Sequence, residues 1–105
     1  MKSDKVYCEY IISCIDKVGR FTSGMKREDF LASELVQSAV ILQLLLIGEL
    51  SKNLSSEFKK STDLPWTQIS GFRNRAIHNY YELELEFVWF AVQNDLVPIK
   101  EAVSK

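Results

Sequence analysis

Apolar residues recur at steps of three and four along most of the chain, the spacing of amphipathic helices. The first such stripe comprises Val6, Tyr10, Ile11, Cys14 and Val18. We therefore expect a first helix that runs to Val18, with Ser3 or Asp4 as its N-cap. Gly24 marks the connection that follows, and Arg27–Ala32 is a candidate short helix.

The second pattern predicts a longer helix, from an N-cap at Ser33 to about Leu54. One side carries Leu35, Ala39, Leu42, Leu46 and Leu50, and the apolar surface is widened by Val36, Val40, Leu44 and Ile47. A helix that is apolar on more than one side is buried on more than one side. We expect a central helix, part of which packs against a second subunit. The segment looks too short, and too interrupted by polar residues such as Gln43, to cross a bilayer.

The last third of the chain contains an ambiguity. Ser55–Lys60 forms a further turn, and Pro65 opens a short helix that Gly71 separates from a helix over Arg73–His78. Glu82–Phe87 then alternates like a strand. A helical stripe nevertheless continues through Leu85, Trp89, Val92, Leu96, Ile99 and Val103. We therefore predict one helix from Glu82 or Leu85 to Ala102, bent by Pro98.

These elements predict an all-α fold of four or five helices, arranged as a bundle in a single domain over residues 1–105. The chain has 47% hydrophobic residues, enough for a real core. We expect Trp66, Trp89, Phe87 and Phe90 in that core.

Charge and cysteine content restrict the classes of function. Thirteen basic and 14 acidic residues give a net charge of -1, which does not suit a long nucleic-acid surface, so any RNA contact should be local. Cys8 and Cys14 lie six apart on one helix and are poorly placed for a disulfide. Together with the lack of a secretory leader, this predicts a cytoplasmic protein. No metal site or cofactor is indicated.

Candidate chemistry is concentrated in Arg73–Tyr81, which contains the only histidine. Histidine exchanges protons near neutral pH, and arginine binds phosphate with two parallel hydrogen bonds. In metal-independent RNA cleavage, His78 could act as acid or base while Arg73 holds the phosphate. Asn74, four residues before His78, could fix the imidazole tautomer or contact ribose. Arg75 points elsewhere and could contact RNA or a partner.

The reaction prefers two proton-transfer groups, whereas each chain has one histidine. A symmetric dimer would bring two copies of Arg73 and His78 to one cleft. The bare spacing of Arg73 and His78 is weak on its own, because a lone histidine is often structural.

A wider pattern resembles the HepT-like family of HEPN-domain proteins. It comprises Ile47-Gly48-Glu49, Asn53-Leu54, Leu64-Pro65-Trp66, Ile69, Gly71, Arg73-Asn74-Arg75, His78, Tyr80, Val88-Trp89 and Asn94-Asp95-Leu96. The arrangement Arg-x4-His-x-Tyr is matched by Arg73, His78 and Tyr80 without a gap.

The resemblance implies a helical, dimeric endoribonuclease toxin of a toxin–antitoxin pair, cleaving RNA without metal. Arg73, His78 and Asn74 would lie in the dimer cleft. An MntA-like minimal nucleotidyltransferase would neutralise the toxin by transferring AMP to Tyr80. Two other readings stay open: a non-catalytic helical module that docks the nucleotidyltransferase, and a purely structural His78 in the core.

Overall fold

The computed structural model describes residues 2–105, and within that range the chain is helical without strands. The elements are α1 (Asp4–Phe21), α2 (Arg27–Leu31), α3 (Glu34–Ser51), α4 (Ser56–Lys60), α5 (Trp66–His78), the 3-10 helix η1 (Tyr80–Glu82), α6 (Leu85–Asn94) and α7 (Leu96–Val103). The predicted all-α class is confirmed, and the alternating Glu82–Phe87 segment forms no strand.

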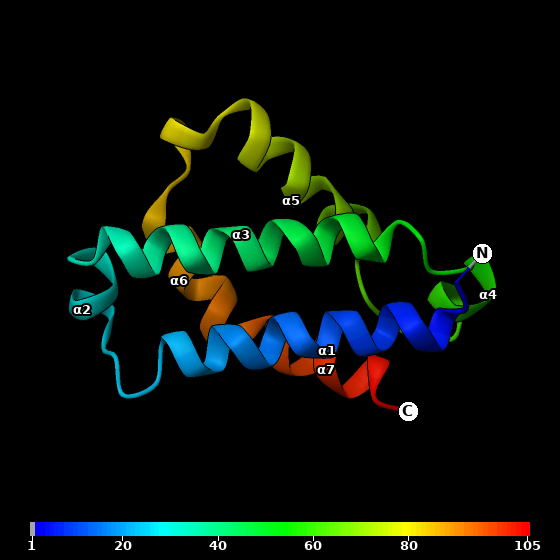
Figure 1. The fold of residues 1–105 in the computed structure, drawn as a ribbon. Coiled ribbons are helices and arrows are strands. Elements are labelled where there is room, and N and C mark those ends of the chain that lie inside the picture. The colour runs from blue at the N-terminus through cyan, green and yellow to red at the C-terminus, as the bar shows by residue number, and fades with distance from the viewer. Residues whose placement is uncertain (1) are drawn as a thin grey trace.

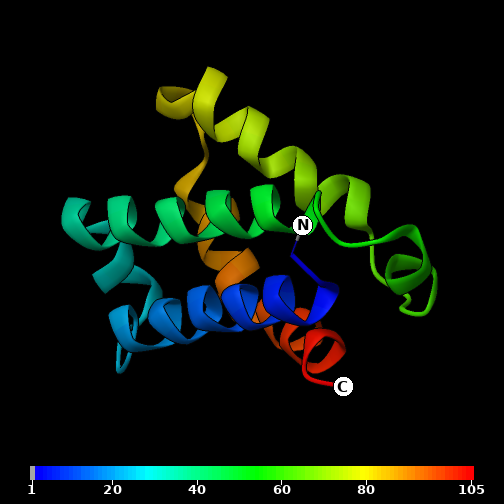
Figure 2. The same ribbon diagram turned by 45° about the vertical axis from the view of Figure 1, so that its right-hand side comes forward.

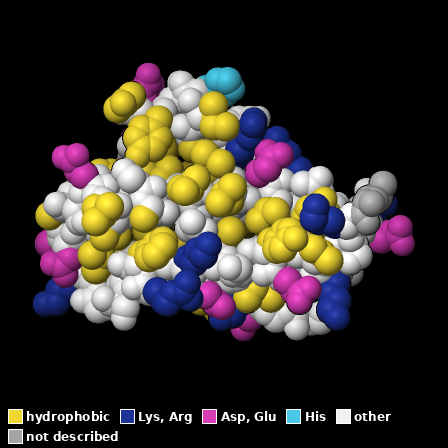
Figure 3. Space-filling view, viewed as in Figure 1, with side chains coloured by type: hydrophobic (Ala, Val, Ile, Leu, Met, Phe, Trp, Pro, Cys, Tyr) yellow, Lys and Arg dark blue, Asp and Glu magenta, His cyan; other side chains and the backbone are white. Residues whose placement is uncertain are grey.

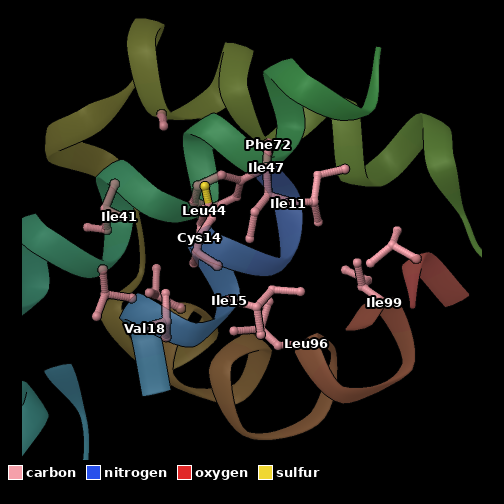
Figure 4. Packing of buried hydrophobic residues seen from close by; sticks show 14 of the residues in the cluster. Ile11, Cys14, Ile15, Val18, Ile41, Leu44, Ile47, Phe72, Leu96 and Ile99 are labelled. Atoms are coloured by element: carbon pink, nitrogen blue, oxygen red, sulfur yellow. The ribbon is translucent and has the colours of Figure 1, made fainter. Parts of the chain in front are cut away.

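Helix α3 occupies the centre of the fold. It packs against α1 on one side and α5 on the other, and α7 packs along α1 (Figures 1 and 2). Figure 4 shows side chains of α1, α3 and α7 meeting in one core, including Ile11, Leu44 and Leu96. By length and composition α3 could span a membrane, contrary to our expectation, but 39% of it is buried. Its position between two helices is that of a core helix.

The buried face of α1 differs in part from the predicted stripe. The buried residues are Cys8, Ile11, Cys14, Ile15 and Val18, whereas Tyr10 is 44% exposed. Cys8 begins a stripe with steps of three and four that Tyr10 does not share, so the packed face is rotated away from Tyr10.

We predicted a side-chain cap at the N-terminus of α1, and the structure has none. Ser3 is the N-cap but its side chain makes no capping hydrogen bond. The Asp4 carboxylate instead accepts hydrogen bonds from the Ser55 backbone N–H at 2.8 Å and the Ser55 hydroxyl at 2.6 Å. Asp4 therefore ties α1 to the start of α4, a contact between segments far apart in the sequence.

The start of α3 follows the prediction, and its second apolar side is only partly covered, since Leu46 and Leu50 pack against the core. The Ser33 hydroxyl accepts a hydrogen bond from the Val36 N–H at 3.2 Å, which confirms the N-cap. The helix ends at Ser51 and not near Leu54. The side that carries Val40, Ile41, Leu44 and Ile47 is buried. Leu35 and Leu42, on the other side, are 81% and 51% exposed.

The C-terminal third departs from the prediction at two places. Gly71 was expected to separate two helices, but it lies inside the continuous helix α5. Packing of α5 against α3 stabilises the helix at this glycine. The expected single last helix is two helices, which meet at Asp95. The ring of Pro98 clashes with a helical carbonyl four residues earlier, that of Asn94, which is where α6 ends. Pro98 is tolerated in the first turn of α7, where its missing N–H costs nothing.

The aromatic residues are divided between core and surface. Trp66 is buried, and Trp89 packs against Phe30 with ring centroids 5.3 Å apart. Phe87 and Phe90 are 46% and 58% exposed, so the expectation that they are core residues was wrong. Phe87 faces the Arg75 side chain of α5 and lines an open groove, which leaves its ring partly exposed.

Candidate functional site

The residues singled out from the sequence lie on α5 and η1. Helix α5 diverges from α3 toward its C-terminal end, and η1 begins just beyond that end (Figure 1). The only histidine, drawn in cyan, stands at the outer edge of this projection in Figure 3. His78 is exposed, so it is not a core residue. Among residues 2–105 no hydrogen bond to its imidazole is formed.

The close approach of α3 and α5 fixes the backbone position of Arg73. A Cβ placed on Gly48 would lie 2.9 Å from the carbonyl oxygen of Ile69 and 3.3 Å from both the Cβ and the backbone nitrogen of Arg73. Only glycine leaves room for α5 at this position of α3. One turn away, the Ser51 and Ser70 hydroxyls lie 2.9 Å apart, and Ser51 also donates to the Gly48 carbonyl at 2.8 Å.

The guanidinium of Arg73 is held at two points. Its Nε lies 3.0 Å from Oε1 of Glu49, an ion pair in which Oε1 accepts no hydrogen bond. Its Nη1 donates to Oδ1 of Asn74 at 3.1 Å. Sequence reasoning did not assign a role to Glu49. Glu49 is the only charged residue of α3 after its first turn, and this could have served as a signal.

Asn74 and His78 both lie exposed on α5, as the four-residue spacing requires. The Asn74 amide oxygen contacts Arg73, and no hydrogen bond joins Asn74 to His78 in the described part of the chain. In this structure Asn74 therefore contacts the guanidinium of Arg73 and not the imidazole of His78.

Tyr80 lies immediately beyond α5. Asn79 ends the helix as expected, but with φ -133° and ψ 41°, outside the left-handed region. The Tyr80 hydroxyl lies 3.3 Å from the Ser38 hydroxyl of α3, and Tyr80 is 40% exposed. Tyr81 is 99% exposed and meets the Tyr80 ring edge to face, with centroids 5.5 Å apart.

Arg75 faces a different environment from Arg73. Its guanidinium carbon lies 5.6 Å from the ring centroid of Phe72 and 5.2 Å from that of Phe87, which are cation–π distances. These residues line an open, largely apolar groove of about 820 Å³ between α5 and the α6–α7 pair, whose lining also includes Gln68 and Asp95.

The two cysteines are not candidates for chemistry. Both are free and buried, and burial raises the pKa of each thiol. A protonated, inaccessible thiol is a poor nucleophile. Residues 2–105 also contain no group of three potential metal ligands.

Comparison with known proteins identifies the family to which the chain belongs. The family model described as "Ribonuclease HepT-like" matches residues 11–105. The chain thus belongs to the HepT-like ribonuclease family. No solved structure gives a significant match.

Two relatives illustrate the similarity. A Thermococcus cleftensis protein named "Probable ribonuclease HepT" is 34% identical over 99% of this chain and 96% of its own length. A Methanocaldococcus jannaschii protein named "Gamma-glutamylcyclotransferase and putative RNase" is 32% identical over 99% of this chain, which spans 47% of that longer protein. Both names include a ribonuclease.

Proposed function

We propose that the chain is an endoribonuclease that cleaves RNA without a metal ion, using Arg73 and His78. The observation that carries the proposal is an exposed imidazole five residues along α5 from a guanidinium that two side chains contact. Family membership supports the same activity. We further propose that residues 1–105 form one domain, which acts in the cytoplasm.

The chemistry follows from these groups. The ribose 2′-hydroxyl attacks the adjacent phosphorus, a base removes its proton, and an acid protonates the departing 5′-oxygen. His78 supplies one of the two proton transfers. Arg73 stabilises the charge that develops on the phosphoryl oxygens. Asn74, which contacts the guanidinium, is proposed to complete the site, and Arg75 to contact RNA further along the strand.

A homodimer supplies the second proton-transfer group. Leu35 and Leu42 of α3 and Ile77 of α5 are exposed apolar residues, and Ile77 is adjacent to His78 in the sequence. Exposed apolar surface of this kind is typical of a subunit interface. We propose that a second copy covers this surface and thereby brings two imidazoles to one cleft.

Tyr80 is the proposed point of control. An MntA-like nucleotidyltransferase would transfer AMP from ATP to the hydroxyl of Tyr80, a residue that is 40% exposed just beyond α5. The added phosphate carries negative charge two residues from His78 and would compete with RNA for Arg73. The proposed system is therefore a toxin and an antitoxin, in which modification blocks the substrate site.

The direct test is cleavage of a labelled RNA by purified protein in the presence of EDTA. The proposal predicts products with 2′,3′-cyclic phosphate or 3′-phosphate ends, and no cleavage by His78→Ala. Equal cleavage by the parent and by folded His78→Ala protein would contradict it.

A second candidate is a non-catalytic helical module that docks a nucleotidyltransferase. The apolar groove of about 820 Å³ and the net charge of -1 favour this reading. It predicts that the isolated protein binds the nucleotidyltransferase but leaves RNA intact at every concentration tested.

A further inference from the structure

Arg73 can stabilise a phosphoryl group only if its guanidinium is oriented toward that group. An arginine side chain has several rotatable bonds, and fixing it in one geometry costs conformational entropy. In this structure the side chain is constrained at both ends. Because Gly48 has no side chain, the backbone of Arg73 can lie directly against α3. The Glu49 carboxylate lies 3.0 Å from Nε of Arg73.

We propose that Glu49 is a positioning residue for the ribonuclease reaction, acting through Arg73; this inference rests on the proposed function. Glu49 engages Nε, and Asn74 accepts from Nη1. These two contacts leave Nη2 and the remaining N–H of Nη1 to bind phosphoryl oxygens. A guanidinium oriented before RNA arrives loses less freedom when it binds the transition state.

The location of the ion pair suits this role. The side chains of Arg73 and Glu49 are 35% and 47% exposed, so the pair lies at the rim of the α3–α5 contact, where RNA can reach the guanidinium. The carboxylate has a second cation nearby, since Nζ of Lys52 lies 3.9 Å from the same Oε1. The shorter distance to Arg73 makes the guanidinium its main partner.

Two substitutions separate positioning from charge. Glu49→Gln keeps a polar side chain of the same shape beside Nε but removes the negative charge, whereas Glu49→Ala removes both. We expect Glu49→Ala to lower kcat by about 10- to 100-fold with little change in KM, since a misoriented group costs about that much. Glu49→Gln should retain more activity than Glu49→Ala. Because Glu49 transfers no proton, the pH profile of kcat/KM should keep its shape in both variants.

Two matched controls exclude trivial explanations. Lys52→Ala removes the neighbouring cation and should leave kcat unchanged. Asp16→Asn breaks another partly exposed ion pair, that with Lys100 at 2.7 Å, on α1 and α7. If Asp16→Asn and Glu49→Ala lower kcat equally at the same thermal stability, the effect is not specific to Arg73 and the inference is overturned.

A readout that does not depend on cleavage completes the test. NMR relaxation at Nε of Arg73 should show a side chain with restricted motion in the parent and a more mobile one in Glu49→Ala. Unchanged motion would overturn the inference. Higher kcat in both Glu49 variants, or loss of the acidic limb of the pH profile, would overturn it too. If the parent cleaves no RNA, the proposed function fails, and the NMR signal alone decides whether Glu49 positions Arg73.

Discussion

The hydroxyl groups of Ser38 and Tyr80 lie 3.3 Å apart although 42 residues separate them in the sequence. This contact joins the first half of α3 to η1, while Glu49 in the second half of α3 holds Arg73. Helix α3 therefore contacts both ends of the Arg-x4-His-x-Tyr segment. His78, between these two contacts, is left free and exposed.

The two adjacent tyrosines allow a sharp test of the modification site. After co-expression with a nucleotidyltransferase of the MntA type, intact mass should increase by one or more adenylate units. Tyr80→Phe should abolish the increase. Tyr81→Phe is the matched control, because Tyr81 is the more exposed of the two, at 99%. If Tyr81→Phe abolishes the increase and Tyr80→Phe does not, the proposed site is wrong.

His78→Ala should remove RNA cleavage and leave the fold intact. The imidazole is exposed and forms no hydrogen bond among residues 2–105. The free energy of unfolding should therefore change by no more than about 0.5 kcal/mol. Urea denaturation alongside the cleavage assay measures both quantities. A loss of stability typical of a core substitution would show that the histidine is structural.

The close approach at Gly48 predicts opposite effects for two glycine substitutions. Gly48→Ala places a Cβ 2.9 Å from a backbone oxygen of Ile69 and should destabilise the fold by about 1–3 kcal/mol. Gly71→Ala, inside α5, meets no atom within 4 Å and should stabilise the fold by about 0.5–1 kcal/mol. Thermal unfolding of both variants provides the comparison. Equal effects would mean that α3 and α5 do not approach as closely as described.

The contact between Asp4 and Ser55 predicts a pH dependence of stability. The hydrogen bonds from the Ser55 hydroxyl and backbone N–H lower the pKa of Asp4 below its usual value of 3.8. A carboxylate whose pKa is lowered by folding stabilises the protein above the unfolded pKa and loses that contribution as pH falls through the folded pKa. Denaturation at pH 6 and pH 3 should show a smaller acid-induced loss in Asp4→Asn than in the parent. An identical loss would show that Asp4 contributes nothing to acid sensitivity.

The exposed apolar surface of α3 predicts the state of association. Leu42→Glu should convert a dimer into a monomer in size-exclusion chromatography with light scattering, because a carboxylate would be buried at the interface. Val97→Glu is the matched control, as Val97 is 62% exposed on α7. A parent chain that is monomeric and fully active would contradict the shared cleft.

The sequence predicted the helices where hydrophobic spacing was strong and local. The Ser33 N-cap, the central α3 and the apolar stripe from Leu85 to Val103 follow from periodicity and capping, which depend on neighbours a few residues apart. It did not predict that Gly71 lies inside a helix, since tertiary packing can override a weak local preference. The break at Asp95 could have been foreseen from Pro98, which acts four residues earlier in the chain.

The sequence by itself determined which residues carry candidate chemistry: one histidine, an arginine at a fixed spacing, and a tyrosine two residues beyond. Only the tertiary structure decided that Glu49 holds Arg73, that Ser38 meets Tyr80, and that Phe87 and Phe90 lie on the surface. Periodicity indicates which side of a helix is apolar. It does not indicate which distant helix covers that side, because that depends on how the whole chain packs.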